Sequence, residues 1–159
     1  MRIWIQLAIG VLLAGQWGCT PPSSISPPAG WVQVDARKFV FFVPPDVKSV
    51  PTMGIDSFVG QYKGDSISLD FDYGFYSDGL QDAEGGFNYV SHLERIDGKK
   101  ARMASFDFPN TGHPFDYAIG VHFPKAGAKG IRLTVFATCK TKADYETAEQ
   151  IFRTIKFKR

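Results

Sequence analysis

The sequence has few of the residues from which catalytic and metal sites are built. Its 159 residues include only two cysteines and three histidines, and His92, His113 and His122 do not have the spacing of metal ligands. There is no Gly-x-Ser-x-Gly turn, no glycine-rich phosphate loop and no dinucleotide-binding fingerprint. We therefore predict no cofactor and expect a non-enzymatic protein, although a hydrolase that uses paired carboxylates stays open.

The chain also lacks a strong excess of charge of either sign. Its formal net charge is +2 at pH 7, which gives no indication of a nucleic-acid partner. The two signs are unevenly distributed, because residues 19–96 contain five Lys/Arg and ten Asp/Glu, whereas residues 97–159 contain twelve and six. One explanation is that acidic and basic strands complement each other within one sheet. The other is a surface with an acidic and a basic end that orients a partner.

The first 18 residues have the layout of a secretory signal peptide. Arg2 precedes an apolar run at residues 3–14, which is shorter than the roughly 20 residues of a membrane-spanning helix, and small residues follow it. Proline pairs at 21–22 and 27–28 separate this run from the remaining chain. We predict that residues 1–18 are a signal peptide and that the protein is exported to the cell envelope.

The stretch LAGQWGC that ends at Cys19 resembles a bacterial lipoprotein signal, in which the cysteine after the cleavage site receives a diacylglycerol. Gly18 fits that pattern, whereas Gln16 and Trp17 depart from it. The resemblance implies that Cys19 is the lipid attachment site and anchors the protein to a membrane, facing the periplasm or the exterior. Residues 19–30 would then be a Pro/Ser tether. The alternative is an unlipidated, soluble secreted protein.

Residues 31–159 are predicted to form a single α+β domain. Alternating apolar and polar residues indicate about seven to eight mostly antiparallel strands, with hairpin turns at residues 64–65 and 97–98. The segment 39–43 is apolar on both faces, which is typical of a central strand. A C-terminal helix is expected after Thr141 and should pack on one face of the sheet. Its apolar stripe consists of Tyr145, Ala148, Ile151, Phe152 and Ile155.

Both ends of this domain resemble PsbP-like domains. The similar stretches are FVFFVP, which ends at Pro44, and the strand, helix and basic end between Ile131 and Phe157. The resemblance implies an extracytoplasmic α/β/α sandwich, a fold found in several bacterial lipoproteins and in extrinsic subunits of photosynthetic membrane complexes. It implies no functional residue. We expect an envelope protein that binds or stabilises a protein partner at a membrane surface.

The alternative function is binding of a small ligand or Ca²⁺ by the acidic and aromatic region at residues 70–88. Asp70 and Asp72 share one face of a predicted strand, roughly 6 to 7 Å apart, and Asp78 and Asp82 follow in a long loop. Carboxylate oxygens are ligands that Ca²⁺ prefers. A solvated strand face with a polar loop would explain the same residues, and no firm metal site is assigned.

The loop is also rich in aromatic residues. Phe71 and Tyr73 are expected in the core, whereas Phe75, Tyr76 and Phe87 are expected to hold the loop against the sheet. Aromatic groups beside carboxylates would also suit a sugar or a peptide.

Two further side chains are assigned to strand faces. Cys139 lies on the apolar face of the strand at residues 131–139, so it is expected to be buried and a poor nucleophile. His122 lies on the polar face of the strand that precedes it.

Overall fold

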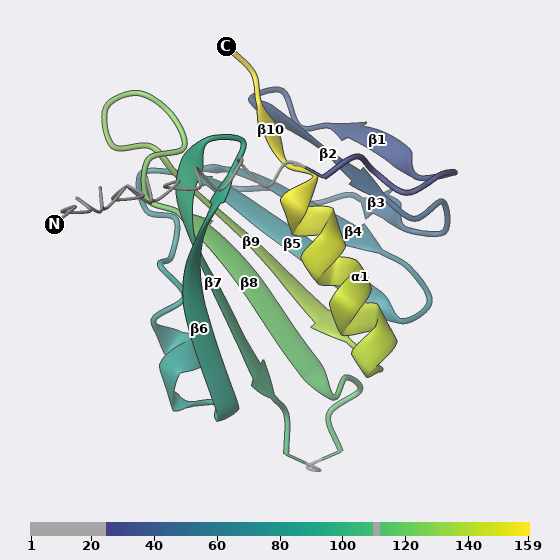
Figure 1. Cartoon of the computed structure of the whole chain (residues 1–159). Helices are drawn as coiled ribbons and strands as arrows, with labels where there is room; N and C mark the ends of the chain where they lie inside the picture. The colour runs from purple at the N-terminus through teal and green to yellow at the C-terminus, as the bar shows by residue number, and fades with distance from the viewer. Residues whose placement is uncertain (1–24, 110–111) are drawn as a thin grey trace, which may run out of the picture.

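The computed structural model describes residues 25–109 and 112–159, so the predicted signal peptide and Cys19 lie outside the described residues. Ten strands of the described chain form two antiparallel sheets, accompanied by one α-helix and one short 3-10 helix (Figure 1). The strands are β1 (Val32–Asp35), β2 (Phe39–Val43), β3 (Lys48–Val50), β4 (Phe58–Lys63), β5 (Ile67–Gly74), β6 (Phe87–Ile96), β7 (Lys99–Asp107), β8 (Tyr117–Phe123), β9 (Arg132–Cys139) and β10 (Lys156–Phe157).

The larger sheet contains seven strands in the order β3-β4-β5-β9-β8-β7-β6. Both predicted hairpins are confirmed, since β4 pairs with β5 and β6 pairs with β7. The turn between β6 and β7 has φ angles of 49° at Asp97 and 74° at Gly98. Positive φ at both central residues is the geometry that matches the twist of two antiparallel strands, which explains why this dipeptide marks the hairpin.

The helix α1 (Lys142–Arg153) begins with the predicted capping arrangement. The side chain of Thr141 accepts a hydrogen bond from the backbone N–H of Asp144, and the Asp144 carboxylate accepts one from the backbone N–H of Thr141. Ala148, Ile151 and Phe152 are buried and turn toward the sheet, where α1 contacts β8 and β9. Across residues 25–109 and 112–159, no helix has the length and apolar character needed to cross a membrane.

The smaller sheet places β2 between β1 and β10, so the segment predicted to be central is central there. Phe39 and Phe41 are buried, and the ring of Phe39 lies 5.2 Å from the ring of Phe71 on β5. This sheet and α1 therefore cover the same face of the larger sheet (Figure 1).

The predicted α+β class with a C-terminal helix is confirmed, with ten strands in two sheets where seven to eight were expected. The additional strands are short: β3 has three residues and β10 has two. Segments of this length show no periodicity in the sequence.

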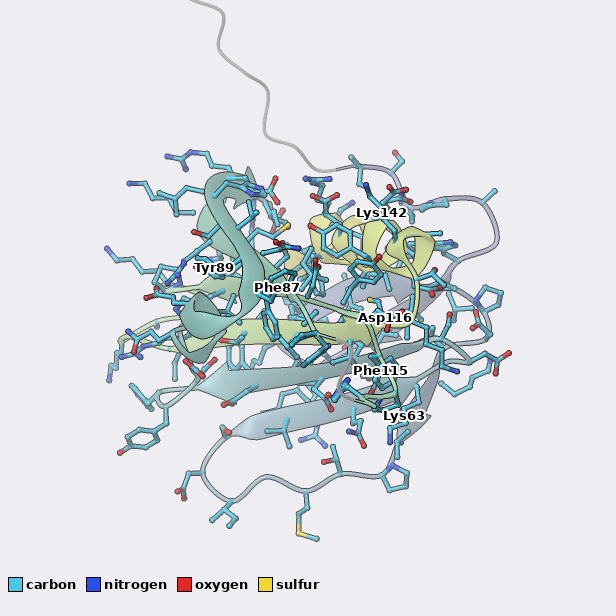
Figure 2. All side chains as sticks on the ribbon, turned by 90° about the horizontal axis from the view of Figure 1, so that it is seen from below. Lys63, Phe87, Tyr89, Phe115, Asp116 and Lys142 are labelled. Carbon is cyan, nitrogen blue, oxygen red and sulfur yellow. The ribbon has the colours of Figure 1, made fainter. Side chains whose placement is uncertain are left out.

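The opposite face of the larger sheet is covered only in part. Figure 2 places Lys142 with α1 on one side of the strands, Phe87 and Tyr89 on the edge strand β6, and Lys63 at the end of β4. On the side away from α1, the segment 75–86 crosses the sheet and includes the 3-10 helix η1 (Asp82–Gly85). We call this segment the cover.

The cover is held by a small apolar cluster of its own. Leu80 and Ala83 pack against Ala104 on β7, with Phe136 at the border. At Gly120 on β8, an added Cβ would lie 2.5 Å from a methyl carbon of Leu80, so a larger residue there would force the side chain of Leu80 to move. A glycine in the middle of a strand often marks such a close approach.

Removing Ile151 should test whether α1 is needed for the fold. Its side chain is fully buried between helix and sheet, so Ile151→Ala should lower the free energy of unfolding by about 2 to 5 kcal/mol. Urea denaturation followed by circular dichroism would measure this. Gln150→Ala, an exposed position on the same helix, is the control and should change it by less than about 0.5 kcal/mol. Equal effects in both variants would contradict the packing described here.

Candidate functional site

A cavity of about 600 Å³ lies between the cover and the strands β4, β5 and β9. We call it the acidic cavity. Its side chains come from segments far apart in the sequence, because β5 and β9 are neighbours in the sheet although some 60 residues separate them. The residues that define it are Val59, Asp70, Asp72, Asp78, Leu80 and Phe136.

Three of the four acidic residues singled out in the sequence meet at this cavity. Asp70 and Asp72 project from the face of β5 away from α1, opposite Phe136 and Thr134 of β9 in the register. Asp78 joins them from the cover. The side chain of Asp82, at the start of η1, lies outside the described residues.

The two carboxylates on β5 differ in their partners. Asp70 is exposed, and its Oδ1 accepts a hydrogen bond of 2.8 Å from Nε2 of Gln61. Oδ1 of Asp72 is buried and accepts no hydrogen bond from any described residue. A buried carboxylate oxygen without a donor is costly. The negative charge of Asp72 is therefore poorly compensated within the described chain.

The described side chains give no support to a metal centre. Among them, no three His, Cys, Asp or Glu residues are grouped closely enough to hold a metal ion. Calcium binding by Asp70, Asp72, Asp78 and Asp82 stays a prediction, because the fourth side chain lies outside the described part.

The hydroxyl of Thr134 is the polar anchor of the cover. It donates to the backbone oxygen of Asp78 and accepts from the hydroxyl of Ser77 at 2.8 Å. Nδ1 of His122 lies 2.9 Å from the same hydroxyl. Because the proton of Thr134 goes to Asp78, we assign the proton of the neutral imidazole to Nδ1. Thr134 thus links β8 and β9 to the cover.

His122 lies on the polar face of its strand, as predicted, but the cover buries it to 8% exposure. Burial lowers the pKa of His122, and the positive charges of Arg132 and Arg102 act in the same direction, while Asp78 opposes them. The sequence contains no sign of this burial, because the covering segment is a distant loop.

The prediction for the aromatic residues in and next to the cover is wrong. Phe75 and Tyr76 of the cover and Phe87 of β6 are 54%, 81% and 60% exposed, so they do not hold the loop against the sheet. Leu80 and Ala83 do so instead. The available signal was Gly120, a glycine in an apolar strand that indicates a close neighbour.

Three other assignments are confirmed. Phe71 is buried, and Tyr73 packs against the same core. Cys139 is fully buried and forms no disulfide with any described residue. Burial raises the pKa of its thiol to about 12, which keeps it protonated and a poor nucleophile.

We compared the chain with models of known protein families and with curated proteins, and found no match in either.

The burial of His122 predicts a pH dependence of stability. Its pKa in the folded protein is below the value of about 6.5 in an unfolded chain. The unfolded state therefore binds the proton more readily, and stability should fall as the pH drops below about 6.5.

Urea midpoints at pH 7.5 and pH 5.5 would measure this fall. His122→Gln removes the titrating group and should flatten the dependence, whereas His92→Gln on the exposed strand β6 should keep it. A dependence unchanged by His122→Gln would contradict the assignment.

Proposed function

We propose that the protein is a non-enzymatic binding module whose acidic cavity binds a small organic cation with an apolar body. One observation supports this above all: three carboxylates line an otherwise apolar cavity, and its lining includes no described Lys, Arg or His. Neighbouring carboxylates without counter-charges favour a positively charged occupant.

The size and the walls of the cavity fit such a ligand. A volume of about 600 Å³ is within the range of small-molecule sites, which combine apolar walls with a few polar groups. Phe136 and Phe106 line the cavity together with Leu80 and Val59. Aromatic rings beside carboxylates stabilise an ammonium group through both hydrogen bonds and cation–π contacts.

The charge of Asp72 supports a cationic ligand. Its side chain lines the cavity and forms no ion pair with any described residue, so its negative charge attracts a cation placed there. Such an interaction is stronger in a partly buried site than on the open surface, because water screens it less.

Exposure favours binding over acid–base chemistry as the role of the acids. Asp70 and Asp78 are exposed, so they form an acidic rim. A general acid usually requires a carboxyl group buried in an apolar pocket.

The location proposed for this module is the cell envelope. It rests on the resemblance of the segment before Cys19 to a lipoprotein signal. A lipid on Cys19 and the tether would hold the cavity near a membrane, where ligand binding or a protein partner would act.

Binding of phenethylammonium, an aryl-alkyl ammonium ion, tests the cavity. Isothermal titration of the full chain should show saturable binding, and Asp72→Asn should weaken it at least about tenfold, because a charge-assisted hydrogen bond is lost. The same variant should unfold at an equal or higher urea concentration, since it removes a buried charge without a counter-charge.

Two controls make this test specific. Glu146→Gln changes the same charge on the exposed side of α1 and should leave the affinity unchanged. 2-Phenylethanol has the same shape without the charge and should bind far more weakly. Equal binding of both compounds would show that the carboxylates do not select a cation. Calcium binding that Asp72→Asn abolishes, without ammonium binding, would favour the metal alternative instead.

The intact mass of the membrane-extracted protein tests the anchor. A chain that begins at Cys19 and has the added mass of a diacylglycerol and an acyl chain is expected. Cys19→Ala should lose this mass and release the protein into the soluble fraction. An unmodified wild-type chain in the soluble fraction would disprove lipidation without bearing on the cavity.

A further inference from the structure

A second cavity, of about 890 Å³, lies on the same face of the larger sheet and has the opposite charge. We call it the basic cavity. The cover separates it from the acidic cavity, and Asp78 lines both. The basic side chains that line it are Lys100, Arg102, His122 and Arg132.

The strand register explains why these side chains meet. Arg102 on β7 pairs with His122 on β8, which pairs with Thr134 on β9. Lys100 and Arg132 lie two residues beyond Arg102 and Thr134 on the same face, past the end of β8, and both line the cavity. If the alignment continues past that end, two strand spacings separate their Cα atoms, about 10 Å. Side chains of this length can converge on one group placed between them.

Two of these cations are not neutralised within the described chain. The side chains of Lys100 and Arg132 form no ion pair or hydrogen bond with any described residue, and both are exposed. Arg102 is different, because Glu84 and the hydroxyl of Tyr89 hold its guanidinium in place. The cavity thus combines two free cations with one fixed cation.

His122 adds a polar ring to the floor. Its Nδ1 is directed at Thr134. The ring is only 8% exposed and lies under the cover, so it forms a fixed part of the cavity floor.

We propose that the basic cavity is a binding site for a phosphoryl group. A phosphate monoester has close to two negative charges near neutral pH, which matches the two free cations. A guanidinium group can donate two parallel hydrogen bonds to two oxygens of one phosphate. Leu93 and Tyr76 also line the cavity, and their apolar surfaces can contact the organic group that the phosphate ester carries. The source of the phosphoryl group is a soluble phosphate ester or a phospholipid headgroup.

Titration of the full chain with phenyl phosphate tests the site. Saturable binding is expected, and the double variant Lys100→Ala/Arg132→Ala should weaken it at least about tenfold, because charge-assisted hydrogen bonds to the phosphate are lost. Lys142→Ala/Lys140→Ala removes the same charge outside the basic cavity and should leave the affinity unchanged. Circular dichroism would verify that each variant is folded.

Sedimentation with vesicles separates the two sources. A headgroup site predicts more binding to phosphatidylglycerol vesicles than to phosphatidylcholine vesicles, and this difference should vanish in the Lys100→Ala/Arg132→Ala variant only. A site for soluble esters predicts phenyl phosphate binding without that difference. The proposal is wrong if neither probe binds saturably, or if both double variants weaken binding equally.

Discussion

The arrangement of the open sheet face depends on the hydroxyl of Thr134. One side chain on β9 satisfies the backbone oxygen of Asp78, the hydroxyl of Ser77 and Nδ1 of His122. A hydroxyl has one donor and two acceptor positions, so all its capacity is used. An apolar residue there would remove this partner from the backbone oxygen of Asp78 and from Nδ1 of His122, at about 1 to 3 kcal/mol each. The hydroxyl of Ser77 would keep its hydrogen bond to the backbone oxygen of Asp72. The path of the cover, and with it the border between the two cavities, follows from this contact and from the packing of Leu80 on Gly120.

Local patterns in the sequence predicted most of the fold. The hairpin at residues 97–98 was predictable because its turn requires positive φ at both central residues, and α1 was predictable because Thr141 and Asp144 cap it. The pairing of β2 with β10 was not predictable from the sequence, since a two-residue strand has no pattern of its own and forms only where a neighbouring strand provides backbone partners. Its backbone groups find partners on β2 only after α1 has returned the chain to that edge.

The candidate site was predicted in part, because only its local features can be read from the sequence. The alternation along β5 places Asp70 and Asp72 on one face, which requires only the period of a strand. Their meeting with Phe136 and Leu80 depends on the pairing of β5 with β9 and on the path of the cover, and these are long-range contacts. The basic cavity was missed altogether, because its cations come from three different strands and look like ordinary exposed residues along the chain.

The uneven distribution of charge along the sequence becomes a spatial separation in the fold. The acidic first half supplies β3 to β6, and the basic second half supplies β7 to β9, but β5 pairs with β9 at the centre of the sheet. Glu84, Glu94 and Asp35 of the first half form ion pairs with Arg102, Arg153 and Lys158 of the second, so part of the charge is neutralised internally. The exposed pair of Asp35 and Lys158 contributes little to stability. Of the other charged residues, Asp70, Asp72 and Asp78 line the acidic cavity, whereas Lys100 and Arg132 line the basic cavity. Because Asp78 borders both groups, a cation bound on one side would reduce the negative field that an anion meets on the other. Occupation of the two cavities should therefore be mutually favourable, and the coupling must be equal in both directions.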